Sequence, residues 1–329
     1  MPVSIVVGGQ FGSEGKGKTS AYFAEQHQAK YVIRVGGTNS GHTVYCKAGN
    51  KYALRQLPTA SINSFSNCIL PAGSYIDLKI LKEEIDSTGI STDRVLIDPM
   101  SVIISDANLK EEKDDGLIEN IGSTGSGTGA AVRSRISRTG QCIFAKDIPE
   151  LKIFLCDTKK VLRDALNKNE RVIIEGTQGY GLSLYHSEFY PNTTSRDTTA
   201  AGFLSEAGLS PLDVDEVVMV IRTYPIRVAG NSGPLPNELT WEELSDSLNL
   251  KNRIYEHTTA TNKLRRVARF DSDIVKKAID ANNPTSIVLN HIDYIPDQSR
   301  QIFISKLESQ INRKIDYIGN SAESILRYE

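Results

Sequence analysis

A glycine-rich loop, GGQFGSEGKGKT, occupies residues 8–19 between the apolar run Val3–Val7 and the helix-like segment TSAYFAEQ. The spacing G-x-x-x-x-G-K-[ST] of a phosphate-binding loop is present at Gly12, Gly17, Lys18 and Thr19. Glycines let backbone N–H groups close on a polyphosphate, a lysine neutralises phosphate charge, and a hydroxyl reaches Mg²⁺. A tight strand-to-helix connection is the alternative. The flanking strand and helix favour a bound nucleotide.

Apolar and amphipathic segments alternate along the chain, without an internal repeat or a low-complexity tract. Strands are predicted at Val3–Val7, Tyr31–Val35, Val95–Ile97, Val172–Glu175, Val217–Ile221 and Ser286–Asn290. Helices are predicted at Thr19–Gln28, Leu78–Asp86, Asp157–Lys168, Ser272–Ala281 and Ser299–Arg313. This alternation predicts an α/β fold with a largely parallel central sheet, helices on both faces, and the phosphate loop after the first strand. No Pro/Ser-rich linker divides the chain, so we expect residues 1–329 to form a single domain.

Several strands run into glycine-rich or polar loops, at Gly8, Gly36 and Gly176. Ligands of open α/β sheets bind at the carboxyl ends of strands, so we expect these loops to converge. The formal net charge of −2 does not favour a nucleic-acid-binding surface. None of the four cysteines belongs to a C-x-x-C pair, which disfavours a zinc site or a disulfide framework. Without an apolar run of about 18 residues or a signal peptide, we expect no membrane segment and a cytoplasmic location, in the host cytoplasm if the protein is viral.

The phosphate loop resembles that of the adenylosuccinate synthetases. The resemblance is carried by Gly8, Gln10, Gly12, Glu14, Gly15, Lys16, Gly17 and Lys18. That family couples nucleoside triphosphate hydrolysis to the joining of aspartate to C6 of inosine monophosphate (IMP). Where the family has an aspartate that takes the purine N1 proton and helps to hold Mg²⁺, this chain has Ser13. A serine hydroxyl is no base near neutral pH, so the resemblance implies a changed substrate or a changed proton route.

A second resembling segment is RVGGTNSGHTV, residues 34–44. It implies that Asn39 binds the nucleotide phosphate, that the Gly41 carbonyl binds Mg²⁺, and that Thr43 joins the triphosphate site. His42 would be the general acid at purine O6, and an unperturbed pKa of about 6.5 suits a histidine to donate a proton near neutral pH. A plain surface histidine is the alternative, which the glycine-rich setting after a strand disfavours.

A third segment, GSTGSGTGAAVRSRISR at residues 122–138, runs from a glycine-rich turn into a helix-like stretch. Such a turn can place backbone donors and a hydroxyl on a phosphate at a helix start. The resemblance assigns Ser123 and Thr124 to the monophosphate nucleotide. It implies that Arg138 reaches that phosphate from a partner subunit, which makes the active enzyme a homodimer. A flexible connection followed by a solvated basic helix is the alternative.

The fourth part of the resemblance joins EGTQGYGLSL at residues 175–184 to YPNTTSRDTTA at residues 190–200. It implies that Gln178 and Leu182 line the purine pocket and that Thr194 binds the nucleotide phosphate. Glutamine and threonine in loops also serve as capping or solvated residues.

The fifth part is the basic run KLRRVAR at residues 263–269, where the family binds the aspartate carboxylates with arginines. Arginine engages carboxylates through two parallel hydrogen bonds. The resemblance assigns this site to Thr261 and Arg265. The chain departs from the family pattern at Asn262, Lys263 and Leu264. A solvated charged segment is the alternative.

The sixth part, LNHIDY at residues 289–294, stands where the family recognises the base of GTP. Asn290 and Asp293 are assigned to the nucleoside triphosphate. His291 replaces a lysine that stacks beneath the base in the family, and this change permits a switch from GTP to an adenine nucleotide. An ordinary strand end is the alternative.

Matches to the family extend from Val6 to about Ile325, and two substrate sets remain open. One is IMP, aspartate and GTP. The other belongs to a phage branch, with serine at the Ser13 position, that makes N6-succino-2-amino-2′-deoxyadenylate from dGMP, L-aspartate and ATP or dATP. The second is favoured because a serine leaves room for the 2-amino group of guanine. A regulatory P-loop protein that binds nucleotide without forming a bond is an alternative of another class.

The resemblance thus gives a complete set of expected site residues. The catalytic residues are Ser13, Lys16 and His42, and Mg²⁺ is held by Ser13 and Gly41. The triphosphate is bound by Gly12, Ser13, Glu14, Gly15, Lys16, Gly17, Lys18, Thr19, Gly41, His42, Thr43, Asn290 and Asp293. The monophosphate nucleotide is bound by Ser13, Asn39, Ser123, Thr124, Arg138, Gln178, Leu182 and Thr194.

Overall fold

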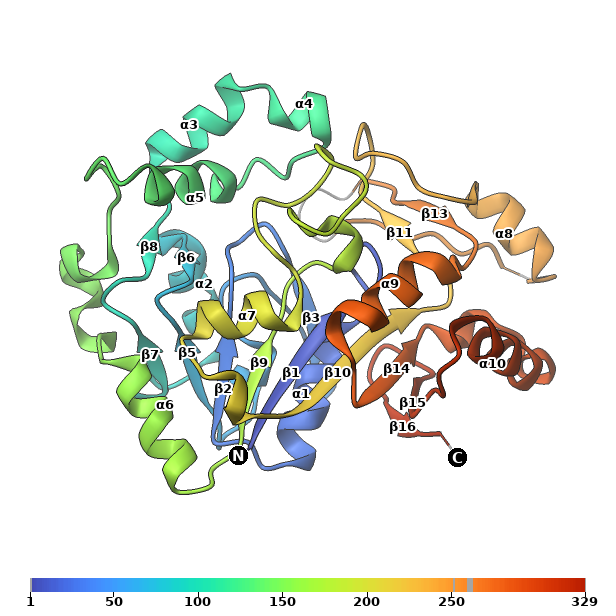
Figure 1. Ribbon diagram of the computed structural model, residues 1–329, viewed down its shortest axis with the longest axis horizontal. Coiled ribbons are helices and arrows are strands. Elements are labelled where there is room, and N and C mark those ends of the chain that lie inside the picture. The colour runs from blue at the N-terminus through green and yellow to red at the C-terminus, as the bar shows by residue number, and fades with distance from the viewer. Residues whose placement is uncertain (1, 251, 259–262, 329) are drawn as a thin grey trace.

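A mostly parallel sheet forms the centre of the computed structural model, which describes residues 2–250, 252–258 and 263–328 (Figure 1). Among these residues, nine strands form the sheet in the order β16-β15-β14-β10-β1-β9-β2-β5-β7. Their bounds, in that order, are Leu326–Arg327, Tyr317–Gly319, Ser286–Asn290, Val214–Arg222, Val3–Gly8, Val172–Glu175, Tyr31–Arg34, Asn67–Leu70 and Val95–Ile97. All neighbours pair in parallel except β16, which is antiparallel to β15. The predicted α/β class is confirmed.

Helices and three small sheets complete the described structure. The helices are α1 (Lys16–Gln26), α2 (Leu78–Thr88), α3 (Asp106–Asp114), α4 (Leu117–Ile121), α5 (Thr128–Ser137), α6 (Thr158–Asn167), α7 (Ala200–Ala207), α8 (Trp241–Ser247), α9 (Ser272–Asn282) and α10 (Asp297–Ile311). The small sheets pair β3 (His42–Tyr45) with β4 (Lys51–Leu54), β6 (Tyr75–Ile76) with β8 (Val102–Ile103), and β13 (Arg266–Ala268) with both β11 (Ile226–Arg227) and β12 (Glu238–Leu239).

The central strands are buried on both faces, as expected for a parallel sheet. Successive side chains of a strand point to opposite faces. On β1, Ile5 therefore packs into the cluster that includes residues of α6, α7, α9 and α10, whereas Val6 packs with Phe23 and Ala24 of α1. Figure 1 shows α7 and α9 crossing the front of the sheet. Helices cover both faces, as predicted.

Predicted helix boundaries differ from the structure mainly at α1 and α10. Helix α1 begins at Lys16, three residues before the predicted start, because the left-handed Gly15 (φ 92°) turns the chain directly into the helix. Helix α10 begins at Asp297, before the predicted Ser299, and ends at Ile311, where the left-handed Asn312 stops it. The predicted strands Val95–Ile97, Val172–Glu175 and Ser286–Asn290 match the observed bounds.

Parallel pairing brings the carboxyl ends of β1, β2, β9, β10 and β14 to one edge of the sheet. The loops that follow these strands contain the residues expected to bind ligands, so their convergence is built into the topology. In the described part of the chain, no helix has both the length and the apolar character needed to cross a membrane.

Candidate active site

The loop after β1 is held in a conformation that depends on glycine. Gly12 (φ 93°), Ser13 (φ 55°) and Gly15 (φ 92°) all have positive φ values. A Cβ atom on Gly15 would lie 2.6 Å from Nδ2 of Asn290. That same Nδ2 donates a hydrogen bond of 2.7 Å to the carbonyl of Glu14. The end of β14 therefore packs directly on the loop, and this close approach requires a glycine at position 15.

Inside the loop, the carboxylate of Glu14 pairs with the ammonium group of Lys16. The Nζ–Oε2 distance is 2.6 Å, and both side chains are buried. The other carboxylate oxygen accepts hydrogen bonds from the backbone N–H groups of Gly12 (2.8 Å) and Gln10 (3.2 Å). Glu14 therefore fixes the shape of the loop and the position of Lys16.

The side chain of Lys18 leaves the loop and reaches the segment before β16. Its Nζ donates to the carbonyls of Ser321 (2.7 Å) and Ser324 (3.2 Å). Burial lowers the pKa of Lys18 to about 8, and the negative charge of Asp293 opposes this shift. Lys18 thus connects the phosphate loop to the C-terminal segment, a contact that the G-x-x-x-x-G-K-[ST] spacing did not indicate. The predicted role of Lys18 toward phosphate stays a prediction.

His42, at the start of β3, lies in a buried polar network at the ends of β2 and β9. Its Nδ1 is 2.7 Å from Oε1 of Glu175 and 2.5 Å from NH1 of Arg34, and Arg34 also pairs with Oε1 of Glu175. The second carboxylate oxygen of Glu175 accepts from the backbone N–H (2.9 Å) and the hydroxyl (2.6 Å) of Thr59. A Cβ atom on Gly17 would lie 2.7 Å from Cβ of His42, so α1 approaches this histidine only because residue 17 is glycine.

Burial, together with the charges of this network, determines the protonation of His42. Burial, together with the positive charges of Arg34 and Lys16, lowers the pKa of His42 to about 3, although Glu175 acts in the opposite direction. Burial alone would raise the pKa of Glu175, but the hydrogen bond from His42 and the charge of Arg34 lower it to about 2. His42 is therefore neutral at neutral pH, and its Nδ1 lies between a guanidinium donor of Arg34 and a carboxylate acceptor of Glu175. It becomes an acid at Nε2 only when an anion nearby raises its pKa.

The expected binding residues for a monophosphate nucleotide meet beside the phosphate loop. Nδ2 of Asn39 donates to the hydroxyl of Thr194 at 3.3 Å, and the N–H of Thr194 donates to the carbonyl of Leu182 at 2.8 Å. Gln178 has a positive φ (54°) and lies against Gly12. Oδ1 of Asn39 and Nε2 of Gln178 are buried without a hydrogen-bond partner among the described residues. These free polar atoms fit a polar ligand.

The glycine-rich turn before α5 lies near the same place. A Cβ atom on Gly37 would lie 2.6 Å from the side chain of Thr128, at the start of α5. In the turn itself, the hydroxyl of Ser123 donates to Oε1 of Glu112, and Thr124 is exposed. Arg138 follows the other end of the ten-residue helix, about 15 Å away along its axis. Arg138 is therefore too far along α5 to serve the end near Gly37 in its own chain.

Arg265 lies just before β13 and is mostly buried. Its NH1 is 3.8 Å from Oε2 of Glu256, and its Nε has no hydrogen-bond partner among the described residues. Burial lowers the pKa of Arg265, Glu256 opposes this shift, and the charge of Arg222 adds to it. The guanidinium group therefore retains donors for an incoming anion. Thr261, the other residue expected here, lies outside the described residues.

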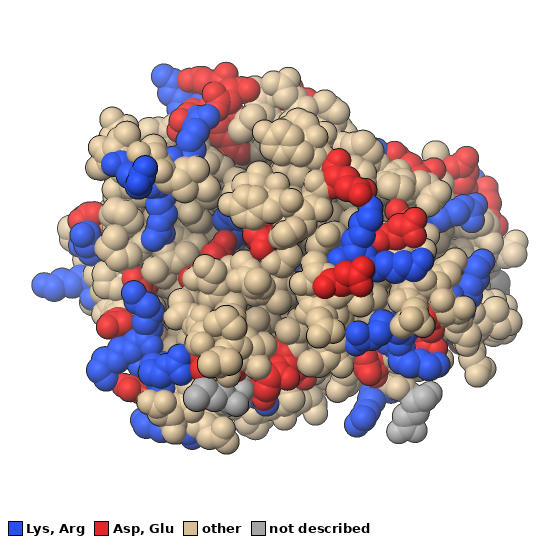
Figure 2. Space-filling model, viewed as in Figure 1, with Lys and Arg blue, Asp and Glu red and all other residues tan. Residues whose placement is uncertain are grey.

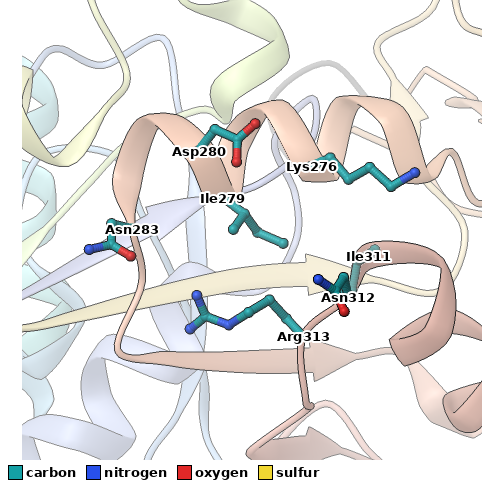
Figure 3. A pocket seen from close by; sticks show the side chains of 7 residues that line it. All are labelled: Lys276, Ile279, Asp280, Asn283, Ile311, Asn312 and Arg313. Atoms are coloured by element: carbon teal, nitrogen blue, oxygen red, sulfur yellow. The ribbon is translucent and has the colours of Figure 1, made fainter.

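A cavity of about 510 Å³ lies elsewhere, between the C-terminal ends of α9 and α10 (Figure 3). It is lined by Lys276, Ile279, Asp280, Asn283, Ile311, Asn312 and Arg313. These helix ends lead into β14 and β15, so the cavity lies at the amino ends of the strands, opposite the loops described above. On the molecular face in Figure 2, acidic and basic side chains lie side by side, a mixed pattern unlike the basic surface that binds nucleic acid.

Sequence reasoning missed several residues that build this site. Arg34, Thr59 and Glu175 position His42, and Arg222 and Glu256 surround Arg265. A charged residue at the end of a buried strand was an available signal, because Arg34, Glu175 and Arg222 are the last residues of β2, β9 and β10.

Comparison with known proteins gives a consistent result. A family model described as adenylosuccinate synthetase matches residues 5–148 and 143–325. The adenylosuccinate synthetase of Methanosphaera stadtmanae is 36% identical over 99% of this chain and 93% of its own length. That of Methanocaldococcus jannaschii is 39% identical over 88% of this chain and 82% of its own length.

Two solved structures have the same fold. Succinoaminodeoxyadenylate synthetase of cyanophage S-2L, bound to dGMP and to dATP as an energy donor, has a TM-score of 0.85 at 28% identity, over 99% of this chain and 95% of that chain. Fully ligated adenylosuccinate synthetase of Plasmodium falciparum has a TM-score of 0.87 at 21% identity, over 100% of both chains.

Proposed function

Because this chain belongs to the adenylosuccinate synthetase family, whose members are ligases that join aspartate to a purine nucleotide, we propose that its own nucleotide substrate is dGMP. The proposed reaction joins L-aspartate to C6 of dGMP with hydrolysis of ATP or dATP. The product is N6-succino-2-amino-2′-deoxyadenylate, a step toward DNA that contains 2-aminoadenine. Family membership argues against a regulatory protein that only binds nucleotide.

The observation that carries the dGMP proposal is the side chain of Ser13. It is exposed at the tip of the phosphate loop, where the family has an aspartate. Guanine differs from hypoxanthine by an amino group at C2, beside N1. A carboxylate that faces N1 fills the space of that amino group, whereas a serine is smaller and its hydroxyl accepts a hydrogen bond. One polar contact of this kind discriminates strongly between substrates, because an analogue that lacks it covers the hydroxyl without giving it a partner.

The similarity to the cyanophage enzyme, which is bound to dGMP and dATP, supports this proposal. A second candidate is adenylosuccinate synthesis from IMP, aspartate and GTP. It is favoured by the names of the more similar relatives, which are 36% and 39% identical and are adenylosuccinate synthetases. Both candidates share the chemistry and differ in the two nucleotides.

We propose a mechanism of two steps. The γ-phosphoryl group leaves the β-phosphate oxygen and bonds to O6 of dGMP while the N1 proton passes to water. The amine of aspartate then displaces phosphate at C6 and loses one proton to water. Lys16 and the backbone N–H groups of the loop stabilise the transferring phosphoryl group. Anionic substrates raise the pKa of His42, so that Nε2 gains a proton, donates a hydrogen bond to O6 during the transfer and gives the proton to the phosphate as it leaves. Arg265 holds the carboxylates of aspartate.

Mg²⁺ is the expected metal ion, and it would neutralise charge on the phosphates when bound. Among the described residues, no group of three or more His, Cys, Asp or Glu side chains forms a protein-only metal site. This fits Mg²⁺, which commonly takes only one or two protein ligands and completes its shell with phosphate oxygens and waters. The exposed hydroxyl of Ser13 and the carbonyl of Gly41 are the oxygen atoms that would hold it.

We also propose that the active form is a homodimer. Arg138 is exposed at the far end of α5, about 15 Å along the helix axis from the end near Gly37. Arg138 of a second copy would then complete the phosphate site together with Thr124.

The test is an assay of phosphate release and product mass with dGMP, GMP and IMP, each offered with aspartate and with ATP, dATP or GTP. We expect turnover with dGMP and an adenine nucleotide, and none without aspartate. Efficient turnover of IMP with GTP, with dGMP left unchanged, would replace this proposal by the second candidate.

A further inference from the structure

A cluster of buried charges lies between the phosphate loop and Arg265. Arg222, the last residue of β10, is fully buried and pairs with Glu256 through both ends of its guanidinium group, NH1 to Oε2 at 3.2 Å and NH2 to Oε1. Oε2 of Glu256 also lies 3.8 Å from NH1 of Arg265, and Oε1 accepts a hydrogen bond of 2.8 Å from the hydroxyl of Tyr294. One carboxylate therefore faces two guanidinium groups.

These two arginines contact Glu256 unequally. Arg222 makes two hydrogen bonds to the carboxylate, whereas the contact of Arg265 is longer than a hydrogen bond. The backbone of Arg265 is fixed nonetheless, because its N–H donates to the carbonyl of Glu256 at 2.8 Å and its carbonyl accepts from Nε1 of Trp241 at 2.7 Å. The guanidinium group of Arg265 is thus held near the carboxylate without being bound by it.

Arg222 also supports the tip of the phosphate loop. Its NH1 donates to the carbonyl of Ser13 at 3.0 Å. Its own backbone is bound on both sides by Gln10, whose Nε2 donates to the Arg222 carbonyl at 3.1 Å and whose Oε1 accepts from the Arg222 N–H at 2.9 Å. β10 and the loop are therefore locked together at this residue.

We propose that Arg222 is a positioning residue for the ligase reaction. By pairing with the carboxylate of Glu256, Arg222 leaves the guanidinium group of Arg265 free to bind a carboxylate of aspartate. The same side chain holds the Ser13 backbone in the position at which the Ser13 hydroxyl faces the nucleotide. This inference rests on the aspartate site at Arg265 in the proposed function, but it does not depend on which purine nucleotide is the substrate.

The charges give a specific consequence for loss of Arg222. Without it, the carboxylate of Glu256 has Arg265 as its nearest cation and closes the 3.8 Å separation, because a buried carboxylate without a partner is costly. Glu256 then competes with aspartate for Arg265. Neutralising Glu256 in the same protein removes the competitor, so the second substitution partly repairs the first. With only a structural role for Arg222, the second substitution would restore KM and kcat together, whereas here KM recovers and kcat does not.

The experiment compares the full-length variants Arg222→Met, Glu256→Gln and the double variant with the wild-type enzyme. Steady-state kinetics with aspartate varied, at saturating nucleotides, give KM and kcat for each. We expect Arg222→Met to raise KM for aspartate by about tenfold or more, as for the loss of a hydrogen bond to a charged group. We expect the double variant to return KM to within about threefold of the wild-type value. Its kcat stays low, because the bond to the Ser13 carbonyl is absent.

Glu238→Gln is the matched control. Glu238 pairs with Arg266, the residue after Arg265, through Nε at 2.7 Å and NH2 at 2.5 Å, and the pair is partly exposed. Removing this neighbouring carboxylate should leave KM for aspartate unchanged. Arg222→Lys is the second variant in case Arg222→Met does not fold. A lysine keeps a positive charge beside the carboxylate of Glu256, but it cannot also donate to the Ser13 carbonyl. We therefore expect a lower kcat, with KM for aspartate near the wild-type value.

Two results would overturn the inference: a KM for aspartate that Arg222→Met leaves unchanged, or a double variant as impaired in KM as Arg222→Met alone. If only Arg222→Lys folds, the inference is overturned when KM for aspartate rises by the same factor as kcat falls. Failure of the proposed site is recognised separately, because Arg265→Met would then leave KM for aspartate unchanged. Failure of the dGMP proposal appears in the wild-type assay, and the kinetics are then run with IMP.

Discussion

Glu175 and His42, 133 residues apart in the sequence, share a 2.7 Å contact between Oε1 and Nδ1. The carboxylate at the end of β9 thereby orients the imidazole at the start of β3, and it is the nearest negative charge that can stabilise the protonated ring. Arg34 and Thr59 hold this carboxylate in place from two other elements. The proposed acid is therefore positioned by three residues outside its own loop.

Replacing Glu175 with glutamine should weaken catalysis more than binding. A glutamine has nearly the same size and keeps polar atoms beside Nδ1 of His42, but the negative charge that raises the pKa of His42 is gone. Protonation then requires lower pH, so we expect kcat to fall by roughly 10²-fold or more, and the alkaline limb of the pH–kcat profile to move to lower pH. Steady-state kinetics between pH 5 and 9 measure both effects.

His42→Ala should lose activity while still binding nucleotide, and near-normal turnover in that variant would exclude His42 as the acid.

Acidification should destabilise the fold through His42. The unfolded histidine gains a proton below about pH 6.5, whereas the folded one does so only near pH 3. Between these values the unfolded chain binds more protons, so the stabilisation by neutral His42 is complete above pH 6.5 and is lost as the pH falls toward 3. Glu175 acts at lower pH, because its stabilisation is present above pH 4.5 and is lost as the pH falls toward 2.

Urea unfolding of the wild-type protein and of His42→Gln at several pH values between 6.5 and 4.5 isolates the contribution of His42, because His291, whose pKa burial also lowers to about 3, contributes equally to both proteins. In this range His42→Gln should show a smaller decrease in the free energy of unfolding than the wild-type protein. Replacing His186, an exposed histidine, with glutamine controls for the loss of an imidazole. Equal slopes for the wild-type protein and His42→Gln would contradict the low pKa of His42.

Alanine at Gly15 should damage the nucleotide site through two separable effects. The positive φ of 92° strains any residue with a Cβ atom, and that atom would also lie 2.6 Å from Nδ2 of Asn290. Gly49 also has a positive φ, of 81°, but no atom lies within 4 Å of the position that a Cβ atom would take. Gly49→Ala therefore measures the cost of the backbone strain without a steric contact. We expect Gly49→Ala to cost about 1 kcal/mol of stability and Gly15→Ala about 2–3 kcal/mol. Thermal unfolding and nucleotide titration measure the difference. Equal effects would mean that the contact with Asn290 adds nothing.

Much of the fold followed from sequence because its signals are local. The apolar runs of β1, β9 and β14 are continuous, as buried parallel strands require, and the glycine-rich turns after β1 and β2 mark the carboxyl edge of the sheet. The convergence of Asn39 with Thr194 was expected, and their hydrogen bond of 3.3 Å is present.

The residues of the site that sequence reasoning missed are held by contacts between residues far apart in the chain. Glu175 reads as a strand end, and its contact with Arg34 spans 141 residues. The contact between Lys18 and Ser321 spans 303 residues, so neither the local spacing nor the family resemblance of the loop indicated it. Burial determines which charges pair, and burial is known only once the strand order is known.

Restoring an aspartate at position 13 should reverse the proposed nucleotide preference. Ser13 is exposed at the tip of the loop, and Arg222 holds its carbonyl at 3.0 Å, so a new carboxylate would occupy the place of the hydroxyl. Aspartate brings a base for the N1 proton and fills the space beside C2 of the purine. We therefore expect Ser13→Asp to raise kcat/KM for IMP and to lower it for dGMP, with a change in their ratio of about 10²-fold or more.

Ser13→Asn is the matched control, since asparagine has nearly the same size as aspartate but is no base. It should lose activity with dGMP without gaining activity with IMP. An unchanged ratio in Ser13→Asp, in a protein that folds and binds nucleotide, would mean that position 13 does not select the purine, and the preference would have to be sought around Gln178 and Leu182.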